Sequence, residues 1–202
     1  MNVNLFINHI MCTLLCLFPG YVFSQERAHF DHYMIKDGLS SNRVYSIAQD
    51  SLGYIWASTD YGLNRFDETH VKQFQKKEYP VVARDEILVV QPFGNGVLVG
   101  SSNGLLIKYD SDRDDFINLQ PQEFDVSYYK EVRGFYLPPK GEKYAFTVGG
   151  IYLYDEKNQS YTSNFKAFDV LSNTHIRSMY VDEYERFWIG TVDCLQIYDK
   201  YG

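Results

Sequence analysis

The chain of 202 residues has few cysteines, no long apolar run and no excess of positive charge. Its three cysteines are Cys12, Cys16 and Cys194. No apolar run reaches the ~18 residues that a transmembrane helix needs, so no membrane span is expected. Lys and Arg number 19 against 26 Asp and Glu, which gives a formal net charge of −7. Binding to a phosphate backbone needs clustered Lys and Arg, so we expect no nucleic-acid partner.

Positions 1–24 contain no Asp, Glu, Lys or Arg. An apolar run at 10–18 is broken by Pro19-Gly20 and has the length of a signal-peptide core. Ser24 offers a small residue before a cleavage site. We therefore expect 1–24 to be a signal peptide and 25–202 to be an exported mature chain; a buried N-terminal helix is the alternative. Removal of the leader would leave Cys194 as the single cysteine, which excludes an intramolecular disulfide.

Aromatic residues are abundant, and they recur at a fixed period. They make up 17% of the chain, which favours β structure because aromatic side chains fit a pleated surface. Four segments each end in an aromatic residue followed by Asp, and these Asp residues lie 43, 45 and 44 positions apart. The pairs are Phe66-Asp67, Tyr109-Asp110, Tyr154-Asp155 and Tyr198-Asp199. Both tryptophans, Trp56 and Trp188, precede the closing Asp of their segment by 11 residues.

Each repeat contains short alternating segments separated by turn residues. Four strands in about 44 residues is the period of a β-propeller blade. The sequence thus predicts an all-β fold of four four-stranded antiparallel blades, at about 36–80, 81–125, 126–170 and 171–202. The strands expected in the first repeat are Val44–Gln49, Tyr54–Ser58, Leu63–Phe66 and Val71–Gln75. We expect Trp56 and Trp188 to lie in the core between blades.

The first repeat, GLSSNRVYSIAQDSLGYIWASTDYGLNRFD at 38–67, resembles the two-component regulator propeller repeat. That repeat has a "GL-S-x-N-x-V" lead, then "D-x-x-G-x-I-W" and "T-x-x-G-L-x-R-(F/Y)-D". The fourth repeat matches well, and the second and third lack the Trp and the Asp-x-x-Gly turn. The resemblance implies a fragment of the periplasmic sensor region of a hybrid histidine kinase. It also implies carbohydrate sensing, because many members respond to oligosaccharides. The matching residues include no kinase segment, so kinase activity is not implied here.

The resemblance leaves two ways of completing the blades. Members of the family have seven-bladed rings, so the four blades would be part of such a ring, completed by the remaining blades of a longer sensor. Alternatively, the segment 28–35 would add an outer strand to the fourth blade and close a four-bladed ring. An open arc would leave sheet faces and Trp188 partly uncovered, with a tendency to self-associate.

Motifs of catalysis and of metal binding are missing. The chain has no nucleophile elbow, P-loop or HExxH. The segment 110–115 departs from a calcium loop because Asp115 replaces the glycine and Pro121 replaces the closing Glu. His29 and His32 are three residues apart, which in a strand places them on opposite sides. We therefore expect no enzyme activity, no catalytic residue, no metal ion and no cofactor.

If a ligand binds, propeller geometry predicts where. The loops that enter each innermost strand and the loops between second and third strands share one face. Aromatic rings there could stack on a sugar while Asn, Asp and Arg bond its hydroxyls, so an oligosaccharide is the expected partner. The candidate ligand-binding residues are Arg43, Asp60, Tyr61, Asp85, Asn103, Tyr128, Tyr129, Arg133, His175, Arg177 and Asp193.

Two other function classes stay open. A propeller-type lyase or glycosidase would need opposed carboxylates on that face, and Asp60, Asp85 and Asp193 are available for this role. A scaffold for protein interactions would need neither a ligand nor catalysis.

Overall fold

The computed structural model describes residues 30–67, 69–74, 78–82, 86–120, 131–162 and 175–199. The chain divides into two compact units, residues 1–32 and 33–202. The described residues of the first unit, Phe30 to His32, form no helix or strand. All the elements discussed below belong to the second unit. Within the described ranges, no helix has the length and hydropathy of a membrane span.

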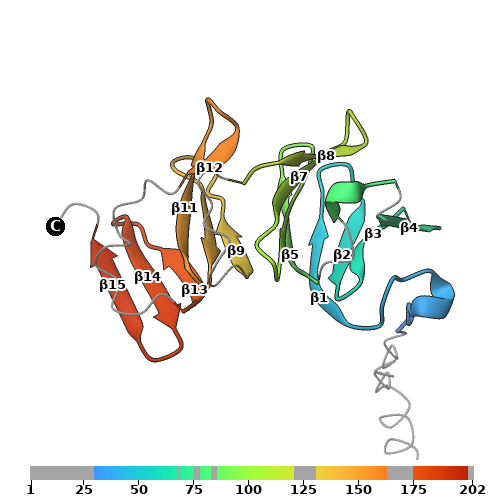
Figure 1. Ribbon diagram of the computed structural model, residues 1–202, viewed down its shortest axis with the longest axis horizontal. Coiled ribbons are helices and arrows are strands. Elements are labelled where there is room, and N and C mark those ends of the chain that lie inside the picture. The colour runs from blue at the N-terminus through green and yellow to red at the C-terminus, as the bar shows by residue number, and fades with distance from the viewer. Residues whose placement is uncertain are drawn as a thin grey trace, which may run out of the picture. The chain divides into compact units, whose positions relative to one another are not determined.

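The second unit is built from antiparallel sheets that follow one another along the chain (Figure 1). We call these sheets blades 1 to 4. The described residues give four strands to each of the first three blades and three strands to blade 4. Two short 3-10 helices, η1 (Ile35–Asp37) and η2 (Pro80–Val82), precede blades 1 and 2. Blade 1 contains β1 (Val44–Gln49), β2 (Ile55–Thr59), β3 (Gly62–Phe66) and β4 (Val71–Phe74), and blade 2 contains β5 (Ile87–Phe93), β6 (Gly96–Ser101), β7 (Leu106–Asp110) and β8 (Asp115–Asn118). Blade 3 contains β9 (Val132–Tyr136), β10 (Tyr144–Thr147), β11 (Gly150–Asp155) and β12 (Ser160–Thr162). Blade 4 contains β13 (Ile176–Val181), β14 (Arg186–Thr191) and β15 (Leu195–Asp199).

The prediction of an all-β fold made of propeller blades is confirmed. Strand order within each blade is sequential, and the first strands of neighbouring blades contact one another: β1 with β5, β5 with β9 and β9 with β13. The same pairing register recurs in every blade. The first residue of the first strand pairs with the last residue of the second strand, as in Val44 with Thr59 and Ile176 with Thr191. Equivalent positions in different blades can therefore be assigned from the pairing alone.

An aspartate holds the turn between the first two strands of blades 1 and 4. Asp50 Oδ1 accepts hydrogen bonds from the backbone N–H groups of Leu52 and Tyr54. Asp50 Oδ2 accepts a 2.7 Å hydrogen bond from Trp56 Nε1. In blade 4, Asp182 Oδ2 accepts the corresponding bond from Trp188 Nε1 at 2.8 Å. The spacing of Asp and Trp in the repeat thus fixes both the turn and the indole ring.

Apolar cores lie between successive blades, because alternate residues of each strand point to opposite faces of its sheet. Trp56 and Leu63 of blade 1 pack with Val90, Val97 and Tyr109 of blade 2. The other face of blade 2 packs against blade 3, and the other face of blade 3 packs against blade 4. Large fully buried side chains supply most of these cores, and burial of each contributes about 1.5–3 kcal/mol.

A polar cluster also joins the outer strands of blades 1 and 2. Lys72 Nζ lies 2.9 Å from both carboxylate oxygens of Asp114, and Tyr109 donates to the same carboxylate at 2.5 Å. Arg65 Nη1 donates to the Tyr109 hydroxyl at 2.8 Å. Asp114 adopts a positive φ of 49° in the turn before β8, which brings its carboxylate back toward blade 1.

Several strand boundaries differ by one or two residues from those expected. The second strand of blade 1 is Ile55–Thr59 rather than Tyr54–Ser58, because Tyr54 belongs to the turn that Asp50 holds. The expected outer strand at 28–35 is not formed by its described residues, which begin at Phe30. Tyr33 packs edge-on against Phe66, with ring centroids 5.4 Å apart, and Ile35 begins η1.

Candidate functional site

In every blade, the entry to the first strand lies beside the turn between the second and third strands. In blade 1, Arg43 Nε lies 3.9 Å from Asp60 Oδ2. In the other blades, the backbone carbonyl of the entry residue accepts a hydrogen bond from the N–H of the turn. These bonds are Ser102 N to Glu86 O at 2.9 Å, Val148 N to Glu131 O at 2.9 Å, and Val192 N to His175 O at 3.2 Å. We call this end of the blades the loop face.

Most of the predicted ligand-binding residues lie on the loop face. They are Arg43, Asp60, Tyr61, Asn103, Arg133, His175, Arg177 and Asp193, and all but the half-buried Asp60, Arg133 and His175 are exposed. Asp85, Tyr128 and Tyr129 lie outside the described residues. Of the carboxylates considered for catalysis, Asp60 lies in blade 1 and Asp193 lies in blade 4.

The first strand of each blade has an irregularity in its pairing close to the loop face. The pairing register shifts at the second residue of each first strand, which places Tyr45, Leu88, Arg133 and Arg177 at the shift. Bulges re-aim side chains and are frequent beside functional sites. Sequence reasoning found the two arginines but missed Tyr45, since alternation alone gives no signal for a bulge.

Several charged groups on the loop face are paired with one another. The Tyr45 hydroxyl donates to the Glu86 carboxylate, which raises the pKa of Tyr45, while the nearby Arg43 opposes this shift. Arg133 pairs with Glu131. Sequence reasoning also missed these two glutamates, whose role depends on the fold bringing them beside the bulge residues. Asp60 Oδ1 and Arg133 Nε are buried and have no hydrogen-bond partner among the described residues.

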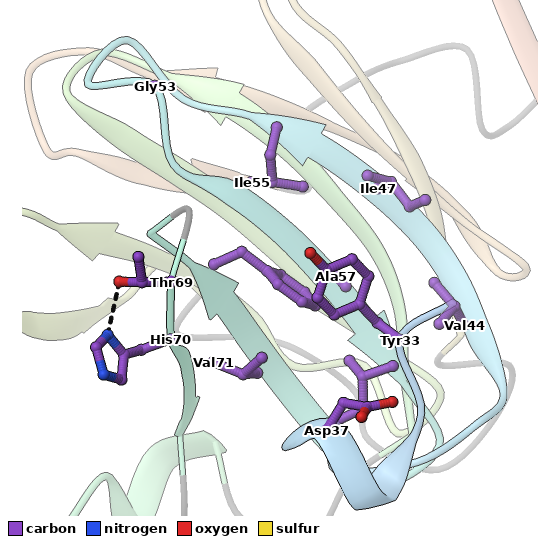
Figure 2. A pocket seen from close by; sticks show the side chains of 12 residues that line it. Tyr33, Asp37, Val44, Ile47, Gly53, Ile55, Ala57, Thr69, His70 and Val71 are labelled. Carbon is purple, nitrogen blue, oxygen red and sulfur yellow. Dashed lines mark hydrogen bonds between the residues drawn. The ribbon is translucent and has the colours of Figure 1, made fainter. Parts of the chain in front are cut away.

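Two cavities lie away from the loop face. The larger cavity has a volume of about 430 Å³ and lies on the outer face of blade 1, the side of the sheet away from the Trp56 side chain. Ile47, Ile55, Ala57 and Val71 line it, and Tyr33 reaches over it from the segment before η1 (Figure 2). The second, of about 350 Å³, lies between blades 3 and 4 at the end opposite the loop face, with Lys140, Glu142, Asp182 and Glu185 among its lining residues.

Comparison with known families decides the nature of the repeats. A family model described as "Two component regulator propeller" matches residues 38–61 and 170–193. Two stretches of the chain, in blades 1 and 4, therefore match this repeat. The two matched stretches contain Asp50 with Trp56 and Asp182 with Trp188, the pairs that hold the turns of blades 1 and 4. No curated protein shows significant sequence similarity to the chain.

Solved structures similar to these propeller repeats include two sensor domains from B. thetaiotaomicron. The extracellular domain of the putative hybrid two component system BT3049 has a TM-score of 0.71 and 22% identity, over 84% of this chain and 25% of that one. The extracellular domain of the putative one component system BT4673 has a TM-score of 0.64 and 18% identity, over 86% and 23%. This chain therefore spans about a quarter of their length.

PorZ is a third similar structure, described as a surface component of the type-IX secretion system of Porphyromonas gingivalis. It has a TM-score of 0.58 and 15% identity, over 85% of this chain and 26% of PorZ. At these identities, the likeness concerns the propeller fold.

Proposed function

We propose that the chain is part of the exported, non-catalytic sensor region of a two-component regulator, and that its loop face binds a carbohydrate signal. The observation that carries this proposal is the position of the family repeats: each matched stretch ends in the turn between the second and third strands, at the loop face. The two sensor domains with similar folds are extracellular domains, which supports export.

The chemistry of the loop face supports a neutral, hydroxyl-rich ligand. Tyr61 is exposed and offers a ring for stacking on the apolar side of a sugar. Asp60 Oδ1 and Arg133 Nε retain unused hydrogen-bonding capacity, which hydroxyl groups could satisfy. The pairing of Arg43 with Asp60 and of Arg133 with Glu131 leaves no strong field of one sign, so a highly charged ligand is less favoured.

The site offers binding groups rather than catalytic ones. Glycoside hydrolysis needs two carboxyl groups on opposite sides of one bond, about 5–10 Å apart. Asp60 pairs with Arg43, and Glu131 pairs with Arg133, so both carboxylates already act as partners for a cation. We therefore assign recognition, and no reaction, to this face.

Calorimetric titration of the full chain against a panel of oligosaccharides tests the proposal. We expect weak binding, because four blades present only part of a convergent loop face and fewer contacts offset the cost of ordering a ligand. Tyr61→Ala should lower the affinity several-fold. Tyr184→Ala is the matched control, since Tyr61 and Tyr184 are exposed at 69% and 67% but Tyr184 lies in the turn at the opposite end of its blade.

Two results would count against the proposal, and a third would contradict the expected weak affinity. Binding of no oligosaccharide would overturn the carbohydrate assignment. Submicromolar binding would show that the site is complete within these blades. Formation of new products on incubation with the same panel, measured by mass spectrometry, would make the protein an enzyme.

Export is tested separately by the N-terminus of the protein recovered from the host. We expect it to begin at Gln25, since Ser24 ends the charge-free leader. A folded, exported protein that still begins at Met1 would contradict the signal-peptide assignment.

A further inference from the structure

The cavity of about 350 Å³ lies between two consecutive blades, at the end opposite the loop face. Its walls are the connection between β9 and β10 in blade 3 and the turn between β13 and β14 in blade 4. The first of these, 137–143, is longer than its counterparts at 50–54, 94–95 and 182–185. Blades 3 and 4 pack against each other within this chain, so the cavity does not depend on any further blade.

Two neighbouring tyrosines line the cavity, and each has a carboxylate beside it. The rings of Tyr136 and Tyr144 have centroids 6.4 Å apart. The Tyr144 hydroxyl donates a 2.5 Å hydrogen bond to Glu142 Oε2. Burial raises the pKa of the Tyr136 hydroxyl, and the charges of Tyr180 and Glu185 add to this shift, so Glu185 lies near that hydroxyl. The cavity thus combines aromatic rings with two carboxylates.

The charges that line the cavity favour a cation. Asp182 is already paired with Arg186, whose Nε lies 2.8 Å from Asp182 Oδ2. Glu142 and Glu185 then face a single lining cation, Lys140, which leaves an excess of negative charge. Within the described ranges, no group of three or more His, Cys, Asp or Glu side chains could hold a metal ion. An organic cation therefore suits the cavity better than a metal ion.

Blades 1 and 2 each supply a cation of their own at the corresponding position. Strand pairing equates Arg65, Lys108 and Leu153 in the third strands of blades 1, 2 and 3. Arg65 Cζ lies 4.4 Å from the centroid of the Tyr54 ring, and Lys108 Nζ lies 5.7 Å from that of Phe93. In blade 3, β11 contains no Lys or Arg. Blade 3 therefore presents aromatic rings to blade 4 without a cation from its third strand.

We propose that the cavity between blades 3 and 4 binds a small organic ammonium ion. The ammonium group lies against the rings of Tyr136 and Tyr144 and pairs with Glu142 and Glu185. Attraction to the ring faces and hydrogen bonds to carboxylates both favour such a cation in a partly desolvated site. The volume is at the lower end of that of small-molecule sites, so a compact amine fits. This site is separate from the loop face and does not rest on the function proposed above.

A nuclear magnetic resonance titration of the full ¹⁵N-labelled chain tests the proposal, with butylammonium as the probe. We expect saturable shifts of backbone amide signals beside the cavity, including those of Gly141 and Glu185. Butanol and butyrate have the same chain length but are neutral and negatively charged. Butanol should bind far more weakly than butylammonium, and butyrate should cause no saturable shift.

Three substitutions of lining residues locate the site. Glu142→Gln and Glu185→Gln should each lower the affinity for butylammonium several-fold, because each removes one negative charge. Lys140→Gln should raise the affinity, since it removes a like charge. Glu183→Gln is the matched control: Glu183 is an exposed carboxylate of the same turn as Glu185 but does not line the cavity. Its affinity should equal that of the wild type.

The outcomes that would overturn the proposal are equally specific. They are no saturable binding of butylammonium, binding of butanol as tight as that of butylammonium, or an equal loss of affinity in Glu183→Gln and Glu185→Gln. The last result would mean a general effect of surface charge. The amide spectrum of each variant shows whether it is folded, and Glu185→Gln carries the test should Glu142→Gln fail to fold.

Discussion

Asp50 and Asp182 show how single residues of the repeat set local structure. Each carboxylate accepts two backbone N–H groups of its turn and one indole N–H. Such bonds to an ionised group are stronger than neutral ones. In blade 4, burial by itself would raise the pKa of Asp182, but hydrogen bonds from Trp188 and Arg186 outweigh it and lower the pKa to about 2.

We predict that Asp182→Asn weakens the acid dependence of stability. A lowered pKa means that the folded state favours the ionised carboxylate of Asp182. Its contribution to stability is therefore complete at pH values above the pKa of the unfolded chain, about 3.9, and is lost as the pH falls toward 2. Denaturant unfolding at a series of pH values measures this. The free energy of unfolding of the variant should fall less across that window than that of the wild type. Glu183→Gln, an exposed carboxylate of the same turn, is the control, and equal acid dependence in all three proteins would refute the assignment.

Trp56→Ala should destabilise the chain far more than Tyr61→Ala. Trp56 is fully buried between blades and stacks on Phe74 at 5.2 Å, whereas Tyr61 projects from a turn. Truncation of a buried aromatic costs about 3–5 kcal/mol, whereas an exposed change costs about 0.5 kcal/mol. Thermal or denaturant midpoints compare the two variants directly. Similar midpoints would mean that the register of blade 1 is wrong.

At the scale of elements, a residue without a side chain allows blades 2 and 3 to approach closely. Gly100 in β6 lies against β9 of blade 3, and a Cβ there would meet Val132 Cγ1 at 2.4 Å and Val89 Cγ1 at 2.9 Å. The equivalent position in blade 1 is Ser58, which does carry a Cβ. The contact between blades 2 and 3 is therefore closer at this point than that between blades 1 and 2.

Gly100→Ala should accordingly weaken the contact between blades 2 and 3. Overpacking of this kind costs about 1–3 kcal/mol. Val132→Ala removes the Cγ1 atom at 2.4 Å but keeps the Val132 Cβ at 2.6 Å, so it relieves part of the clash and the double variant should lose somewhat less stability than the sum of the two single variants. Chemical denaturation of the four proteins gives this coupling. Strict additivity would place Gly100 away from Val132.

Strand positions could be predicted from the sequence because the repeat carries its own markers. The blades can be aligned by the aromatic-Asp pair that ends each repeat and, in blades 1 and 4, by the tryptophan 11 residues before it. Bulges at Tyr45 and Arg133 could not be predicted, because they depend on strand pairing. The ties of Asp114 to blade 1 were also missed, since they join residues about 40 positions apart. The loop face was predicted from propeller geometry, but its glutamates Glu86 and Glu131 emerged only from the fold.

At the scale of the whole chain, burial separates two kinds of blade face. The faces between blades 1 and 2, 2 and 3, and 3 and 4 are packed, while the outer faces of blades 1 and 4 carry exposed apolar side chains. This is the pattern of consecutive blades within a propeller. Such contiguous apolar patches mark interaction surfaces. Each outer face has the apolar pattern of a face that packs against another blade.

The most direct test of this account is the solvent access of the two tryptophans, measured by acrylamide quenching of single-tryptophan proteins. Trp188→Phe leaves only Trp56, and Trp56→Phe leaves only Trp188. We predict weak quenching of Trp56, which blade 2 covers, and quenching several-fold stronger for Trp188 on the open face of blade 4. Equal quenching of the two tryptophans would contradict consecutive stacking of four blades with open ends.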